Sequence, residues 1–141
     1  MAGGSVQFLG WQADDVIREH YRRCRALLFP GDEDFGIVPI EALACGMPVI
    51  ALGRGGVAET VDHAVGQTYG DATPAGLLAA IDDWESRGCQ FDADLARSRA
   101  EGLSLDVFRE RILGLIGEVV AGGMSRPVPP APHFNIVAAH P

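Results

Sequence analysis

The chain has 141 residues, of which 48% are hydrophobic and 21% charged; this is the composition of a folded domain with its own core and excludes disorder throughout. It carries 19 acidic and 11 basic residues for a net charge of −8, and every basic residue is arginine. Nucleic acids and anionic membrane surfaces are bound by clustered cations, so this charge balance argues against both as direct partners.

The apolar runs and the cysteines indicate the compartment. No apolar run approaches the ~20 residues that span a bilayer, so no transmembrane segment is expected. Residues 1–7 lack the basic and apolar regions of a signal peptide. Cys24, Cys45 and Cys89 are spaced too widely for a disulfide framework or a metal knuckle. We therefore expect reduced thiols, no bound metal and a cytoplasmic location.

The chain begins with short apolar runs that alternate with an amphipathic stretch. Residues 6–9 alternate weakly and predict a short strand that ends at Gly10. Residues 14–24 carry acids first and then apolar residues at helical spacing, which predicts a helix. The continuous apolar run 26–29, closed by a Pro-Gly pair, predicts a strand buried on both faces of a parallel sheet.

The following stretch repeats this order. Residues 36–45 predict a helix, with Pro39 tolerated because it lies in the first turn. Residues 48–52 predict the next buried strand and residues 57–61 another short helix. Residues 66–70 predict one more strand.

The remainder of the chain is mainly helical. Thr73 begins a predicted helix whose apolar stripe includes Trp84, and Ser104 begins another whose stripe includes Phe108. Both aromatic side chains are expected in the core. Residues 123–141 hold five of the nine prolines and predict a flexible tail.

The alternating order of strands and helices implies right-handed crossovers and a parallel sheet with helices on both faces. The fold class expected for residues 1–122 is therefore α/β, as one domain. Ligands of such sheets bind at the carboxyl ends of the strands. Two loops lie at that edge, residues 30–36 and residues 53–56.

The first loop and the helix after it carry two carboxylates, Glu33 and Glu41, separated by seven residues. Gly36 lies between them at the helix entrance, where free backbone N–H groups and the helix dipole favour a phosphate. Carboxylates that flank such a site can accept hydrogen bonds from sugar hydroxyls. The pattern favours a phosphorylated, polyhydroxylated ligand such as a nucleotide sugar.

Other interpretations of these residues stay open on spacing alone. Glu33 and Glu41 are also compatible with two solvated carboxylates, or with the acid and base of a glycoside hydrolase. Gly55 and Gly56, in the second loop, are compatible with a simple turn.

Several motifs resemble the retaining GT-B glycosyltransferases of family 4, the glycosyl transferases group 1. The similarity covers roughly residues 6 to 121 and is to the second, donor-binding half of their C-terminal domain, a partial doubly wound (Rossmann-like) sheet. Its most specific part is the E-x7-E block followed by an A-x-G-x-P-V-I strand. The matching segments are Phe8-Leu9-Gly10, Pro30 to Gly36, Glu41 to Ala51 and Gly55 to Val61.

The resemblance implies a reaction and roles for the two carboxylates. These enzymes move a sugar from a nucleoside diphosphate donor to an acceptor hydroxyl with retention of configuration, and they need no metal or other cofactor. Glu33 corresponds to the residue against the donor sugar, sometimes called catalytic, and Glu41 to the residue that binds the ribose hydroxyls. The implied activity is that of a hexosyltransferase, with mannose among the candidate sugars, in polysaccharide or glycolipid assembly.

Further positions match residues that lie near the donor in this family. Some approach the sugar and the diphosphate through backbone amides, and others belong to a small-residue loop or open the next helix. They are Phe35, Gly36 and Ile37 at the helix entrance, Gly55 and Gly56 in the loop, and Glu59 in the following helix.

The chain departs from the family pattern in two respects. The family closes a glycine-rich loop of its N-terminal domain on the diphosphate and neutralises it with an Arg/Lys pair, and no segment of this sequence matches either. Arg54 is the only cation near the two loops. We expect a fragment that binds its donor weakly and does not turn over alone, with the missing N-terminal acceptor domain as its partner. Peripheral membrane contact by the parent protein is compatible with this interpretation.

Two other functions compete with the enzyme fragment. The chain is also compatible with a non-catalytic nucleotide-sugar binding module, which the absent diphosphate cations favour. The third candidate is an interaction module whose α/β half pairs with a separate chain. The sequence does not identify the donor base, the hexose or the acceptor.

Overall fold

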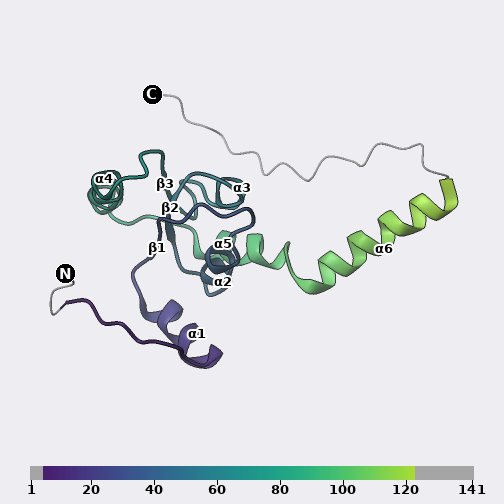
Figure 1. Cartoon of the computed structure of the whole chain (residues 1–141), viewed down its shortest axis with the longest axis horizontal. Coiled ribbons are helices and arrows are strands. Elements are labelled where there is room, and N and C mark those ends of the chain that lie inside the picture. The colour runs from purple at the N-terminus through teal and green to yellow at the C-terminus, as the bar shows by residue number, and fades with distance from the viewer. Residues whose placement is uncertain (1–4, 123–141) are drawn as a thin grey trace.

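The computed structural model describes residues 5–122, which form three strands and six helices around a parallel sheet (Figure 1). The strands are hydrogen-bonded in the order β1-β2-β3. In chain order the elements are α1 (Asp14–Arg23), β1 (Leu27–Phe29), α2 (Ile37–Ala44), β2 (Val49–Leu52), α3 (Val57–Thr60), β3 (Gly66–Tyr69), α4 (Pro74–Ser86), α5 (Ala93–Glu101) and α6 (Leu105–Gly122).

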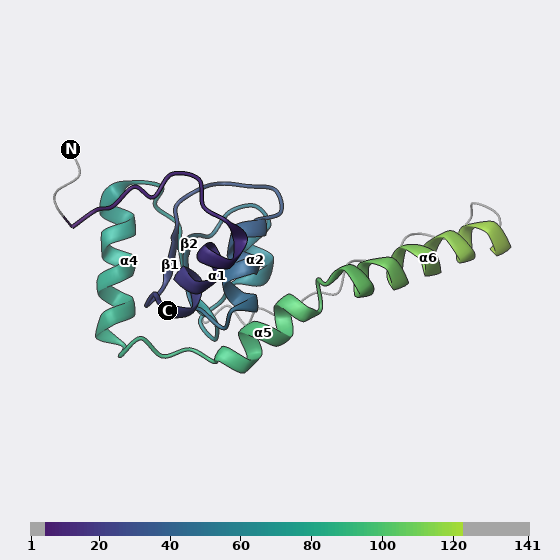
Figure 2. The ribbon, with the colours of Figure 1, turned by 90° about the horizontal axis from the view of Figure 1, so that it is seen from below.

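The central strand β2 is buried on both faces. Val49 and Ala51 belong to the larger core cluster with α2, α3 and α5, whereas Ile50 packs with Ala80 and Trp84 of α4. Successive side chains of a strand point to opposite faces, which explains this division. Helices α2 and α4 accordingly lie on opposite sides of the sheet (Figure 2). The expected α/β fold is confirmed.

Helix α2 positions the candidate site, and backbone features at both its ends define it. Gly36 precedes the helix with φ +77°, in the left-handed region that favours glycine. Pro39 is the third helical residue, in the first turn as predicted. Gly46 follows the helix with φ +71°, and its amide donates to the carbonyl of Leu43 at 2.8 Å.

Two expectations for the first strands are wrong. Residues 6–9 form no strand, because none of the described strands pairs with them, and Phe8 stays 86% exposed. β1 is not buried on both faces, since it is an edge strand of the described sheet and Leu28 remains 46% exposed. A four-residue alternation without a hydrogen-bonding neighbour does not form a strand by itself.

The helical part also differs from expectation. Trp84 is buried as predicted, but Phe108 is 59% exposed and not in the core. It lies on α6, which projects away from the sheet (Figures 1 and 2). Helix α5 was not expected, because its packing face consists of Ala96 and Ala100, which give little hydrophobic periodicity. The predicted tail, 123–141, lies outside the described residues.

Candidate functional site

The two loops at the carboxyl edge of the sheet are held in direct backbone contact. The amide of Gly56 donates to the carbonyl of Glu33 at 3.0 Å. Gly55 has φ +59°, and a Cβ there would lie 2.1 Å from the same carbonyl oxygen. At Gly56 a Cβ would lie 2.5 Å from the carbonyl oxygen of Asp34. Only glycine fits at both positions, so this loop is a close-packed junction and more than a simple turn.

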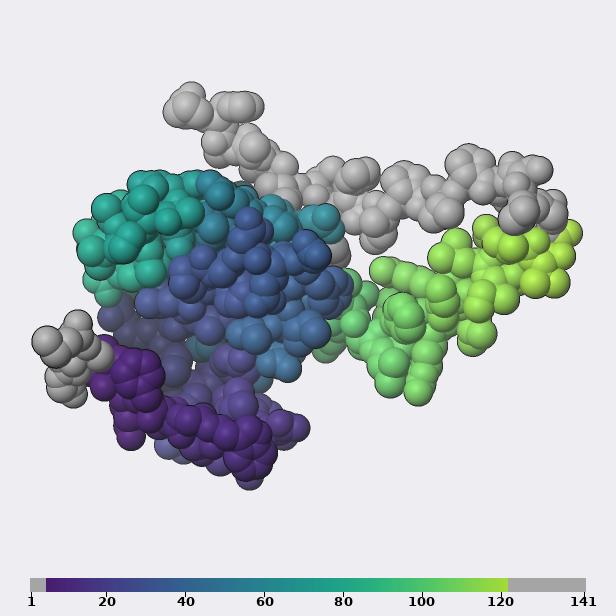
Figure 3. All heavy atoms as spheres, viewed as in Figure 1, coloured from purple at the N-terminus to yellow at the C-terminus, as the bar shows by residue number. Residues whose placement is uncertain are grey.

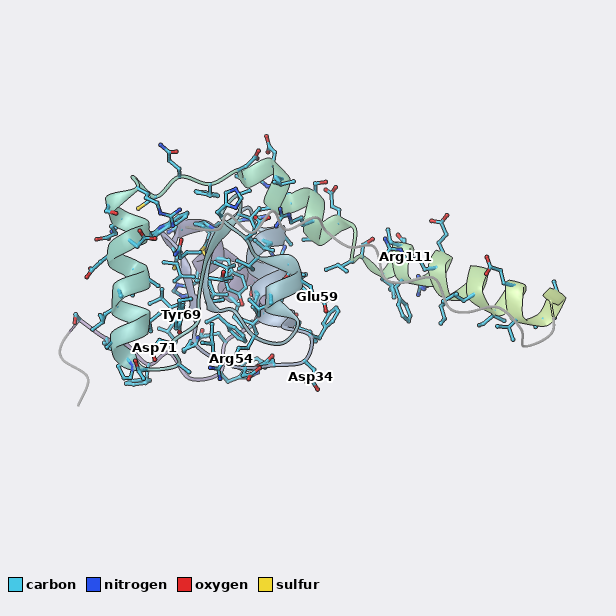
Figure 4. The ribbon with its side chains drawn as sticks, turned by 90° about the horizontal axis from the view of Figure 1, so that it is seen from above. Asp34, Arg54, Glu59, Tyr69, Asp71 and Arg111 are labelled. Atoms are coloured by element: carbon cyan, nitrogen blue, oxygen red, sulfur yellow. The ribbon has the colours of Figure 1, made fainter. Side chains whose placement is uncertain are left out.

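The same loop is also fastened to the end of β3. The amide of Gly53 donates to the carbonyl of Tyr69 at 2.8 Å, and Nη2 of Arg54 donates to the carbonyl of Gly70 at 3.4 Å. Figure 4 shows Asp34, Arg54 and Asp71 along the same end of the molecule. The carboxyl edge is therefore a pre-formed surface that carries several acids and one arginine.

The entrance of α2 offers free hydrogen-bond donors. Within residues 5–122, the amides of Ile37 and Val38 find no acceptor, and no side chain caps the helix. Phe35 and Ile37 expose 56% and 61% of their surface at this entrance. Unpaired amides at a helix N-terminus favour an anion, so this surface can hold a phosphate group.

Three predicted carboxylates differ in their surroundings. Glu33 and Glu59 are exposed, and their carboxylates form no hydrogen bond or ion pair within the described part of the chain. The Glu59 amide donates to the carbonyl of Gly56 at 3.2 Å, which ties α3 to the second loop. Glu41 instead lies on the side of α2 that faces α1, where its Oε2 accepts a hydrogen bond from the Tyr21 hydroxyl at 3.4 Å.

Glu41 borders a hollow of about 320 Å³ between α1 and α2. Figure 3 shows the N-terminal segment that contains α1 set against the body of the molecule at this place. Burial and the nearby Glu41 carboxylate raise the pKa of the Tyr21 phenol, so the phenol stays protonated as a donor at neutral pH. The lining residues are Asp14, Ile17, Arg18, Tyr21, Glu41, Ala44 and Cys45.

The structure thus brings together most of the predicted site residues and adds one that the sequence did not single out. Loop 30–36, loop 53–56 and the entrance of α2 share one edge of the sheet, whereas Glu41 faces α1. Tyr21 was expected only as an apolar position of its helix. Its only signal in the sequence is a hydroxyl on the predicted packing face of the helix. That signal does not indicate that its hydrogen-bond partner is Glu41, 20 residues further along the chain.

Residues 5–122 contain neither a cluster of metal-binding side chains nor a membrane-spanning helix. No group of three or more His, Cys, Asp or Glu side chains there is arranged to hold a metal ion. None of the helices in this part is both long and apolar enough to cross a membrane.

Known sequences and structures resemble this chain at moderate identity. Human alpha-1,3/1,6-mannosyltransferase ALG2 is 40% identical over 81 residues, covering 57% of this chain and 20% of that protein. The D-inositol 3-phosphate glycosyltransferase of Salinispora arenicola is 34% identical over 123 residues, covering 83% of this chain and 27% of that protein.

Two solved structures share the fold. Sucrose-phosphate synthase from Thermosynechococcus elongatus superposes with a TM-score of 0.69 at 26% identity, covering 84% of this chain and 31% of that one. Anabaena Alr3699/HepE, solved in complex with UDP and glucose, gives a TM-score of 0.63 at 26% identity and covers 82% and 32%. This chain therefore spans about a third of these structures and less of the two curated relatives.

The family model described as Glycosyl transferases group 1 matches residues 1–100. That match includes the loops at the carboxyl edge, the entrance of α2 and the Glu41 hollow. Together with the GT-B type of α/β fold, it shows that the chain belongs to the glycosyl transferases group 1 family.

Proposed function

We propose that this chain is the donor-binding part of a retaining hexosyltransferase that uses a nucleoside diphosphate sugar. The whole protein would transfer the hexose to an acceptor hydroxyl, with a separate domain supplying the acceptor site. Family membership supports sugar transfer, and the Anabaena neighbour solved with UDP and glucose supports a nucleotide-sugar ligand.

The proposal assigns each part of the donor to a part of the site. Glu41 accepts hydrogen bonds from the ribose hydroxyls, and the amides from Phe35 to Ile37 face the diphosphate. Glu33 lies against the sugar and stabilises charge there as the bond to the diphosphate breaks. Gly55 and Gly56 keep the first loop in place. Glu59 borders the same edge, and no metal or cofactor is required.

One observation supports this assignment more than any other. The free amides of Ile37 and Val38 lie at the start of the same helix that carries Glu41, directly after the loop that carries Glu33. An anion site is therefore followed, about one turn along the helix, by a carboxylate that borders a hollow. A nucleoside diphosphate presents the complementary groups, two phosphates and a ribose diol.

A non-catalytic nucleotide-sugar binding module is the second candidate. It is favoured by the scarcity of cations, because Arg54 is the only arginine in the two loops and already donates to the carbonyl of Gly70. A module of this kind binds the donor without transferring it. The same surface would also suit an interaction module that completes its site with another chain.

Calorimetric titration with UDP, GDP, UDP-glucose and GDP-mannose tests the donor site and identifies the base. Glu41→Ala is expected to weaken binding of the preferred nucleotide by about 1–3 kcal/mol, because charge-assisted hydrogen bonds to ribose are lost. Glu118→Ala removes an exposed glutamate from α6 and serves as the matched control, with wild-type affinity expected. Equal affinity of wild type and Glu41→Ala would contradict the ribose assignment.

A further inference from the structure

Building on the donor site proposed above, we propose that Tyr21 is a positioning residue that holds the Glu41 carboxylate in the orientation that accepts the ribose hydroxyls. Tyr21 lies on α1 and Glu41 on α2, and their side chains meet at the hollow between the two helices. The contact is the only side-chain hydrogen bond to Glu41 within residues 5–122.

The geometry of Tyr21 suits this role because its ring is anchored at one end. The half-buried ring packs against the larger core cluster. Its hydroxyl reaches the edge of the hollow and donates to Oε2 of Glu41 at 3.4 Å. A rigid aromatic side chain that packs against the core presents its hydroxyl in one place at little cost in conformational entropy.

The contact leaves Glu41 able to bind a ligand. A carboxylate has two oxygens with about four acceptor positions, and the phenol uses one of them. Oε1 has no partner in the described part of the chain, and the hollow beside it is open. A nucleoside therefore meets a carboxylate that is already oriented and only half satisfied.

The same hollow holds a competing partner for Glu41. Arg18 lines it one turn before Tyr21, yet no ion pair joins Arg18 and Glu41 in the structure. Without the Tyr21 hydroxyl, the exposed carboxylate is free to turn toward this guanidinium. That rotation would move the carboxylate away from the ribose hydroxyls. The Tyr21 hydroxyl therefore favours the carboxylate orientation that binds ribose over the one that pairs with Arg18.

Tyr21→Phe tests the proposal because it keeps the ring and removes only the hydroxyl. UDP and GDP are titrated into the full chain, and the better ligand is compared with its 2′,3′-dideoxy form. We expect Tyr21→Phe to weaken the ribonucleotide by about 3- to 10-fold, the contribution of one hydrogen bond. Its affinity for the dideoxynucleotide should not change. In the Glu41→Ala background the same substitution should have no further effect.

Tyr69→Phe is the matched control, because it removes the hydroxyl of the other tyrosine, which is on β3 and forms no hydrogen bond with Glu41. If Tyr21→Phe leaves ribonucleotide affinity unchanged while Glu41→Ala lowers it, Tyr21 has no positioning role and the donor site stands. Equal losses for the ribonucleotide and the dideoxynucleotide would also overturn the proposal. If the folded wild-type chain binds neither nucleotide, the donor-binding function fails and the role of Tyr21 fails with it.

Discussion

Two regions of the molecule use apolar residues in opposite ways. In the body formed by the sheet and helices α2 to α5, residues such as Leu43 and Val49 are almost completely buried. In α6 the apolar residues recur at helical spacing, yet Leu113 is 66% exposed and Val120 81% exposed. The comparison teaches that spacing predicts a helix and its apolar stripe, whereas burial depends on what the rest of the fold places opposite that stripe.

The proposed donor site lies mainly in the first of these regions. Its loops are fixed by backbone contacts with the body, from Gly53 at the end of β2 to Gly56 at the start of α3. Residues 5–13, like α6, contribute exposed apolar side chains and no strand. Function is therefore expected to follow the integrity of the body and to be insensitive to changes in α6.

The largest difference in stability between the regions is expected when one leucine in each region is replaced by alanine. Leu43→Ala should lower the free energy of unfolding by about 2–5 kcal/mol, because it opens a cavity in the core. Leu113→Ala, on the exposed part of α6, should change it by less than about 0.5 kcal/mol. Urea unfolding followed by circular dichroism measures both. Similar losses for the two variants would show that α6 is packed.

Replacing a glycine by alanine should change stability in opposite directions in the two regions. Gly55→Ala places a Cβ against the Glu33 carbonyl at a positive φ, so we expect a loss of about 2–4 kcal/mol. Gly114→Ala meets no atom within 4 Å and lies inside a helix, so it should stabilise α6 by up to about 1 kcal/mol. Chemical unfolding of both variants checks the prediction. A neutral Gly55→Ala would mean that the two loops are not in contact.

The smallest effect concerns the ion pair within the body that joins α5 to the segment after α3. Arg99 donates to Asp62 at 2.8 Å, and both side chains are largely buried. Burial alone would raise the pKa of Asp62, but the hydrogen bonds from Arg99 and the Ala64 amide and the Arg99 charge outweigh it, so the pKa lies below its ordinary 3.8. The stabilisation is therefore complete above the ordinary pKa and is lost as the pH falls through the lowered one.

Asp62→Asn tests this pH dependence. The variant should lose about 1–2 kcal/mol at pH 7, because Arg99 keeps no charged partner there. Below about pH 4 wild-type stability should fall more steeply than that of the variant, so the two unfolding curves converge. Parallel curves over pH 3–7 would show that Asp62 does not carry this dependence.

Particular residues show how far the sequence predicts the fold. The run 48–52 predicted a buried strand, and β2 is that strand, because a continuous apolar run suits a position covered on both faces. The run 26–29 is also continuously apolar but forms an edge strand, because the residues of a single strand do not specify its position in the sheet. Helix α5 was not predicted, because its buried residues are alanines, which pack closely but give only a weak hydrophobic periodicity in the sequence.

The candidate site shows the same limit. The run 36–45 predicted a helix that begins between Glu33 and Glu41, and the structure has this helix as α2. The contact between the two loops and the hydrogen bond from Tyr21 to Glu41 join segments separated by about 20 residues. Such contacts follow from tertiary packing, and no local pattern in the sequence specifies them.

The most direct test of the proposed donor site is an amide NMR titration of ¹⁵N-labelled chain with UDP and with GDP. One experiment observes both regions, because every non-proline residue of the body and of α6 has a backbone amide signal. We predict that the amide chemical shifts of Phe35, Gly36, Ile37 and Glu41 change on titration, while those of α6 do not. Changes confined to α6 or to residues 5–13, or saturable binding that leaves residues 35–41 unaffected, would contradict the account.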